Sequence, residues 1–226
     1  MTRKQEFKAP LTIIFVNIYF FILIHFTSQS EEFIRSLILF PEHLKSGRFL
    51  CVITSGFIHY DLRHLFLNML GVVAFGRVVE RHLGALKTLF IYFGSLAISL
   101  LFAGIIHLYF LNNNIAIIGA SGAVMGLLAT AMLLDPYVVT YEMIFPIPVM
   151  IKGWMYLYAD IQGLLNPQPD GISHLAHMFG FLSIALLIYF LSKKERKILK
   201  EGLIINLFSI MMFFIAWLVV YHLKNR

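Results

Sequence analysis

Charged residues and cysteines are scarce in this sequence. Charged side chains make up 13% of the 226 residues and apolar side chains 59%, which is more apolar surface than a soluble domain of this length needs for its core. The single cysteine, Cys51, excludes an internal disulfide framework. The His-Glu-x-x-His pattern of zinc proteases is absent as well. We therefore expect an integral membrane protein without a metal or another cofactor.

Seven apolar segments have about the length that a membrane-spanning helix needs. They cover residues 11–26, 64–79, 89–111, 119–134, 150–165, 173–191 and 203–223. No small-residue cleavage site follows the first segment, so we expect it to remain as a span rather than to be a signal peptide. The sequence thus predicts an all-α polytopic membrane protein with the lipid bilayer as its environment.

The basic residues predict the orientation of these spans. Most of them lie in alternate connections: Arg3, Lys4, Lys8, Arg77, Arg81, Lys87, Lys152, Lys193, Lys194, Arg196, Lys197 and Lys200. Because cytosolic loops are enriched in Lys and Arg, the N-terminus should be cytosolic. The net charge of +6 then indicates membrane anchoring and no nucleic-acid partner. The small size fits the cell membrane of a prokaryote.

In this orientation the second, fourth and sixth spans all begin at the non-cytosolic face. Their first turns carry nearly all of the side chains within the spans that we consider as candidates for catalysis: His64, Asn68, Ser121, Ser173, His174 and His177. A helix rises about 1.5 Å per residue, so His177 lies only about 6 Å deeper than Ser173. Three distant segments therefore bring a hydroxyl and imidazoles to one layer, as a nucleophile and its base require.

Each of these residues also has a purely structural interpretation. A lone Ser or His in a membrane helix usually forms a helix–helix hydrogen bond. Gly122 with Gly126, and Ala176 with Gly180, are small-xxx-small pairs that let membrane helices approach closely. Such an approach between the fourth and sixth spans would itself bring Ser121 to His177. Together, at matched depth, this serine and histidine favour catalysis.

The second span offers hydrogen-bond donors for a developing oxyanion. His64 and Asn68 are four residues apart and share a helix face. Asn always supplies a donor and His does so in either charge state. Ser121 begins its own helix, where unpaired backbone N–H groups favour negative charge. For His64 alone an interhelical polar pair is the alternative.

Three motifs, taken together, resemble the rhomboid family of intramembrane serine proteases. They are His-Leu-Phe-Leu-Asn at residues 64–68, Gly-Ala-Ser-Gly at 119–122 and His-Met-Phe-Gly at 177–180. They occur in the family's order, in the second, fourth and sixth spans. The resemblance implies the rhomboid fold, a six-helix core followed here by one further transmembrane helix.

The resemblance also implies the roles of individual residues. Ser121 would be the nucleophile and His177 the general base, as a dyad without a carboxylate. His64, Asn68 and the backbone at Gly119 and Ser121 would stabilise the oxyanion. The substrates would be transmembrane segments of other membrane proteins.

The remaining segments also find counterparts in the family. We expect a catalytic core over residues 1–192, and a basic connector with the last transmembrane helix over residues 193–226. Residues 27–62 resemble the family's membrane-embedded first loop, and the fifth span resembles its mobile gate. That span carries Asp160, which we expect to pair with a polar group of a neighbouring helix rather than to take part in catalysis.

Three other classes of function compete with a serine protease. A metal transporter or metalloprotease could use the histidines His59, His64, His174 and His177. An aspartyl intramembrane protease needs two membrane aspartates, but Asp135 and Asp160 lack its motifs. The most serious alternative is a non-catalytic rhomboid-like protein that binds membrane clients. Retention of Ser121 and His177 favours the protease.

Overall fold

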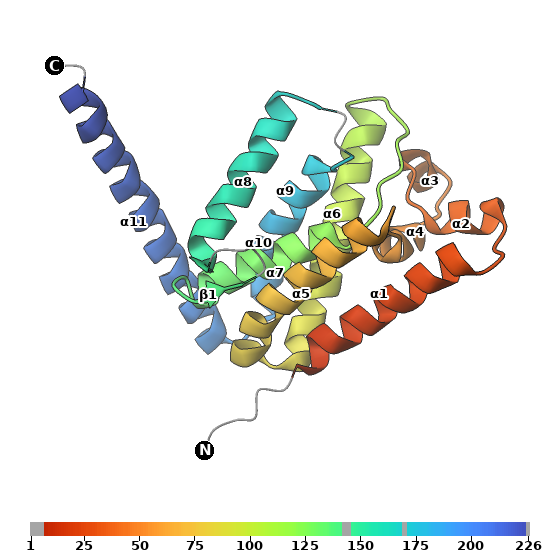
Figure 1. Cartoon of the computed structure of the whole chain (residues 1–226), viewed down its shortest axis with the longest axis horizontal. Coiled ribbons are helices and arrows are strands. Elements are labelled where there is room, and N and C mark those ends of the chain that lie inside the picture. The colour runs from red at the N-terminus through yellow and green to blue at the C-terminus, as the bar shows by residue number, and fades with distance from the viewer. Residues whose placement is uncertain (1–6, 142–145, 169–170, 225–226) are drawn as a thin grey trace.

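The computed structural model describes residues 7–141, 146–168 and 171–224; Arg3 and Lys4 of the orientation argument lie outside these ranges. Its longer helices are α1 (Lys8–Phe26), α5 (Leu62–Leu83), α6 (Ala85–Tyr109), α7 (Ser121–Leu134), α8 (Val149–Leu165), α9 (His174–Leu182) and α11 (Lys193–Lys224) (Figure 1). The short ones are α2 (Glu31–Leu37), α3 (Pro41–Lys45), α4 (Cys51–Thr54), η1 (Ser55–Phe57), α10 (Ile184–Leu187) and η2 (Ile188–Phe190).

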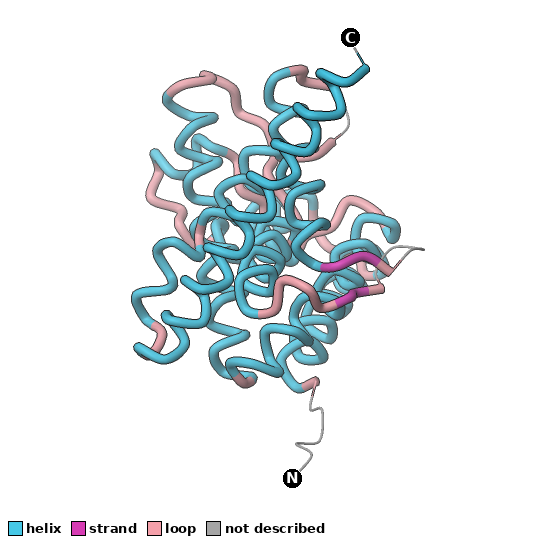
Figure 2. Tube along the Cα trace, turned by 90° about the vertical axis from the view of Figure 1, so that its left-hand side faces the viewer, coloured by secondary structure: helices cyan, strands magenta, loops and turns pink. Residues whose placement is uncertain are grey.

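Helices dominate the described chain (Figure 2), as the predicted all-α class requires. Two short antiparallel strands, β1 (Val139–Thr140) and β2 (Ile147–Pro148), lie between α7 and α8. All seven predicted spans are helical, although the sixth is divided into α9, α10 and η2. Within the described ranges, four helices are long and apolar enough to cross a membrane, namely α1, α5, α6 and α11. The protein is therefore an all-α polytopic membrane protein.

Capping residues explain why α5 and α11 begin earlier than the apolar pattern predicts. The Asp61 side chain accepts the His64 N–H at 2.7 Å, so α5 starts at Leu62. At α11, the Glu195 N–H donates to Ser192 Oγ at 3.3 Å and the Ser192 N–H donates to Glu195 Oε2 at 2.9 Å. This reciprocal capping box begins the helix at Lys193. The predicted basic connector is thus the first part of α11.

Helix α7 occupies the centre of the bundle and contacts α5, α6, α8, α9 and α11 (Figure 1). Its glycines allow this crowding, since a Cβ at Gly122 would lie 2.6 Å from Ser99 Cβ of α6. On the α9 side, a Cβ at Gly180 would lie 2.7 Å from the Gly122 carbonyl carbon. The predicted close approach of the fourth and sixth spans is confirmed, and it is a contact of backbone with backbone.

Hydrogen bonds and ion pairs join the basic ends of several helices. The buried Glu80 carboxylate of α5 accepts the backbone N–H groups of Lys8 and Ala9, both at 3.1 Å, and so caps α1. Lys87 at the start of α6 pairs with Glu195 of α11. These helix ends therefore form one layer at the same side of the molecule.

Lys152 differs from the other basic residues that we assigned to this cytosolic layer. Its side chain is fully buried, and Nζ donates to the Thr140 carbonyl at 2.7 Å and to Thr140 Oγ1 at 2.9 Å. A buried ammonium needs such partners to offset its lost hydration. Lys152 therefore fastens α8 to β1, and its charge is buried rather than exposed at the surface of the layer.

We expect Gly180→Ala to lower the free energy of unfolding by about 1–3 kcal/mol, because the added methyl group overlaps the α7 backbone at Gly122. Thermal unfolding of the detergent-solubilised protein measures this effect. Ala185→Val adds methyl groups at an exposed position of the neighbouring α10 and serves as control. Equal stability of the two variants would show that α7 and α9 do not depend on the contact.

Candidate active site

The segment that leads into α7 is held by Ser55, a fully buried residue that our sequence reasoning missed. The Leu39 N–H donates to Ser55 Oγ at 3.1 Å, and the Gly119 N–H donates to the Ser55 carbonyl at 3.0 Å. Ser55 Oγ itself donates to the Ile117 carbonyl. These bonds tie the first loop to the backbone two residues before Ser121. No sequence motif marks Ser55, because its role arises only from the folded loop.

Ser121 is the first residue of α7, as the sequence analysis expected. The first intrahelical bond runs from the Val124 N–H to the Ala120 carbonyl at 3.0 Å. The N–H groups of Ser121, Gly122 and Ala123 therefore precede the helical ladder. The Ser121 side chain is half-buried, and its hydroxyl forms no hydrogen bond within the described ranges. The Ser121 hydroxyl thus lies at the positive end of the α7 helix dipole.

His64 lies directly against the turn that precedes Ser121. Gly119 has a φ of +102°, and a Cβ there would lie 2.7 Å from His64 Nε2. His64 Nδ1 accepts the Tyr60 N–H at 3.4 Å, so in a neutral ring the proton is on Nε2. The Gly119 N–H already donates to the Ser55 carbonyl. The contribution of Gly119 is therefore its missing side chain, which leaves space for the His64 imidazole. The structure thus brings a His64 donor beside the Ser121 turn.

Asn68 is buried one turn further along α5. Its amide donates to the His64 carbonyl at 3.0 Å, which uses one of its two hydrogens. Three residues later, a Cβ at Gly71 would lie 2.6 Å from Val124 Cγ1, and Val124 is one turn after Ser121. The α5 face that carries Asn68 is therefore packed against the α7 face that carries Ser121.

By helix periodicity, His177 lies closer than His174 to the α9 face that packs on α7. A Cβ at Gly122 would lie 3.3 Å from the Ala176 carbonyl oxygen, so the residues after Ser121 and before His177 are in contact. At about 100° per residue, His177 lies about 80° from the centre of the Ala176–Gly180 face and His174 about 140°. The Ser121 hydroxyl and the His177 ring are not hydrogen-bonded here. Such bonds are often long before substrate binds.

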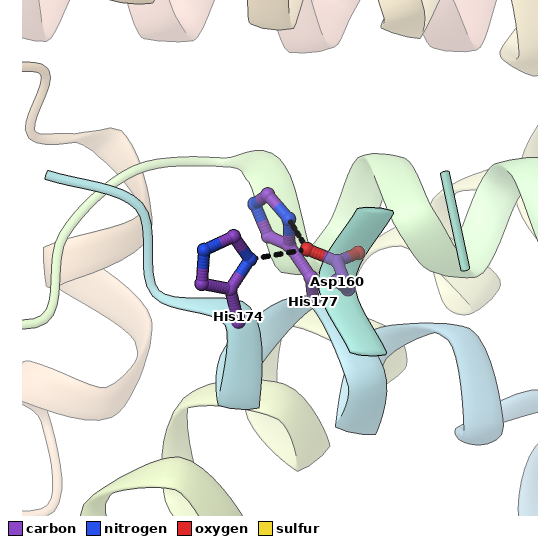
Figure 3. A group of neighbouring side chains, drawn as sticks. All are labelled: Asp160, His174 and His177. Carbon is purple, nitrogen blue, oxygen red and sulfur yellow. Dashed lines mark hydrogen bonds and ion pairs between the residues drawn. The ribbon is translucent and has the colours of Figure 1, made fainter. Parts of the chain in front are cut away.

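A carboxylate lies beside His177, although the resemblance implied a dyad without one. Asp160 of α8 is only 3% exposed, and its Oδ1 is 2.9 Å from His177 Nδ1 and 2.8 Å from His174 Nδ1 (Figure 3). The expectation that Asp160 pairs with a polar group of a neighbouring helix is confirmed. Both of its partners belong to α9, and one of them is the expected general base.

Comparison with known proteins agrees with the three motifs. Residues 46–194 match the Rhomboid domain family. The chain belongs to the rhomboid family. Two relatives come from Arabidopsis thaliana. "RHOMBOID-like protein 12, mitochondrial" is 29% identical over 153 residues, which are 62% of this chain and 45% of that protein. "Rhomboid-like protein 11, chloroplastic" is 28% identical over 208 residues, 84% of this chain and 69% of that protein.

The four histidines considered above as ligands of one metal site lie in two pairs in this rhomboid protein. His59 packs edge-on against His64 with ring centroids 4.9 Å apart. His174 and His177 instead meet Asp160, and the ligand atoms of these three residues lie within 4.8 Å of one another, a set that could hold a metal ion. Asp135 pairs with His82 at 3.9 Å instead of with Asp160, so the two aspartates have separate partners.

We expect acid to destabilise this rhomboid protein through His59, which lies between η1 and α5 and is 1% exposed. Burial lowers the pKa of His59 from 6.5 to about 4, and repulsion from His64 and His25 adds to this. As the pH falls from 6.5 to about 4, the unfolded chain takes up a proton that the folded chain does not. Stability should decrease across this window by up to about 3 kcal/mol.

Thermal unfolding of the wild type and His59→Phe in detergent between pH 4 and pH 7 measures this contribution. The variant should lose part of the pH dependence, because Phe takes up no proton in either state. Identical slopes of stability against pH for the two proteins would contradict the prediction.

Proposed function

We propose that this rhomboid protein is an intramembrane serine protease with Ser121 as nucleophile and His177 as general base. The observation that carries the proposal is the backbone contact of Gly122 with Ala176 and Gly180. It joins the residue after the serine to the residue before the histidine, on helices from separate motifs. Tight packing of α7 on α9 needs only small residues, and does not by itself require a hydroxyl and an imidazole at the edge of the contact.

The chemistry follows from the positions of the surrounding donors. His177 Nε2 takes the Ser121 proton as Oγ attacks the substrate carbonyl, and the imidazolium then protonates the leaving amine. Negative charge on the carbonyl oxygen is stabilised by the free N–H groups at the start of α7, by His64 Nε2–H and by the second hydrogen of the Asn68 amide. Water, with His177 again as base, hydrolyses the acyl-enzyme.

The substrates in this proposal are transmembrane segments of other proteins. A helix in the bilayer satisfies its own backbone, so its carbonyl groups are shielded until a segment unwinds. The Ser121 turn lies at the end of α7 opposite to the basic layer, where an unwound segment reaches water. Residues that break helices near the scissile bond would make this step easier.

The proposed catalytic unit is residues 1–192, and residues 193–226 carry the added helix α11 that supports it. Helix α11 docks on the far end of α7, where Gly202 lies against the Leu133 backbone and the Asn206 amide donates to the Met132 carbonyl at 2.9 Å. The basic layer of helix ends supports a cytosolic N-terminus. The named relatives are organellar, so the expectation of a prokaryotic cell membrane has no support from them.

We expect Ser121→Ala to abolish labelling by a fluorophosphonate probe, lowering the rate at least about 10³-fold, because the proposed nucleophile is removed. The assay needs no knowledge of the substrate. Ser28→Ala, a change at an exposed position before α2, should label like the wild type. Absence of labelling in folded wild-type protein would instead favour the non-catalytic, client-binding alternative.

The two α9 histidines should differ in the same assay. His177→Ala should lose labelling as fully as Ser121→Ala, whereas His174→Ala should keep about a tenth or more of the wild-type rate, because its ring is turned further from α7. A folded His174→Ala that is inactive, together with an active His177→Ala, would make His174 the base.

A further inference from the structure

We infer that Asp160 positions His177 for catalysis, by holding the imidazole in the tautomer whose Nε2 can accept the Ser121 proton. This inference rests on the protease function proposed above. It adds a carboxylate to a site that the resemblance describes as a serine–histidine dyad. The observation behind it is that one buried oxygen, Asp160 Oδ1, meets both α9 histidines.

The burial of Asp160 gives the contact its importance. A carboxylate within a membrane protein is costly unless its charge is compensated, and such residues usually mark function. Among the described residues, Asp160 Oδ1 meets two polar partners, His174 Nδ1 at 2.8 Å and His177 Nδ1 at 2.9 Å, while Oδ2 is buried and has no hydrogen-bond partner there. The charge therefore depends on these two imidazoles.

This arrangement determines where the imidazole protons are. An ionised carboxylate has no hydrogen to donate, so each neutral ring must donate from Nδ1. The lone pair of His177 is then on Nε2, the atom that a general base uses when Nδ1 is held by a carboxylate. A His177 ring with its proton on Nε2 could not take a proton from Ser121 there.

His174 stabilises the same carboxylate without facing α7. Its ring lies over Gly163, where a Cβ would collide with the imidazole, and Gly163 is three residues after Asp160 on α8. The glycine thus makes room for a second donor to Asp160. The side chain of Asp160 is held between two rings, and its position relative to His177 is fixed by both.

The proton transfers balance without a change at Asp160. The Ser121 proton moves to His177 Nε2, and the Nδ1 proton stays in its bond to Asp160. The imidazolium lies beside an ionised carboxylate, which stabilises the positive charge until Nε2 gives the proton to the leaving amine. Asp160 touches neither the substrate nor the serine, so it acts only through His177.

Asp160→Asn tests the inference, because it keeps the shape of the side chain and removes its charge. We expect fluorophosphonate labelling of the full-length protein in detergent to fall about 10²-fold, with partial recovery in Asp160→Glu. Asp135→Asn removes a carboxylate that does not contact these histidines and should label like the wild type. Labelling of Asp160→Asn within about twofold of the wild type would overturn the inference.

A second measurement separates positioning from a merely structural role. ¹⁵N shifts of the histidine rings report the tautomer, and the His177 signals are assigned by their loss in His177→Gln. We expect Nδ1–H in the wild type and a shift toward Nε2–H in Asp160→Asn, with unchanged thermal stability. A wild-type His177 with its proton on Nε2, or an unchanged tautomer in Asp160→Asn, would overturn the inference.

The same experiments distinguish the two proposals from each other. An unlabelled but folded wild type refutes the protease function, while the tautomer of His177 still tests its contact with Asp160. Because Asp160, His174 and His177 could also bind a metal, labelling is repeated after dialysis against EDTA. We expect no change. A loss of labelling that Zn²⁺ restores would overturn the inference, since the histidines would then be ligands.

Discussion

The structure depends on the contact of backbone with backbone between Gly122 of α7 and Gly180 of α9. Helices in a bilayer gain nothing from moving apolar side chains out of lipid, so close packing must hold them together. Side chains larger than hydrogen would separate the two helices. With glycine at both positions, the first turns of α7 and α9 lie together, and the polar groups at the edges of this contact share one small volume.

Most of the buried polar side chains that the structure describes have a hydrogen-bond partner. Ser55 fastens the first loop to the segment before α7, and Asn68 donates within its own helix. Asp160 is the costliest group, because it carries charge at 3% exposure. Its two imidazole partners include His177, the proposed general base, so the same hydrogen bonds that stabilise this charge also fix the orientation of the His177 ring.

The opposite end of the bundle shows how charge and helix ends cooperate. Glu80 caps α1 by accepting two backbone N–H groups, and Lys87 pairs with Glu195 at the start of α11. These interactions bind helix ends that are basic in sequence into one layer. The turn before Ser121 and this basic layer lie at opposite ends of α7. One end of the bundle therefore carries the candidate active site, and the other end carries the basic layer.

The sequence by itself determined the helical class, the seven apolar segments and the residues of the three motifs, because hydropathy and spacing are local properties. It also predicted that α7 and α9 approach closely. It did not reveal Ser55, the buried state of Lys152 or the bond from Asp160 to His177. Those depend on which side chains from distant segments meet, and only the tertiary structure decides this, since a charge buried in a membrane protein must find its partner elsewhere in the folded chain.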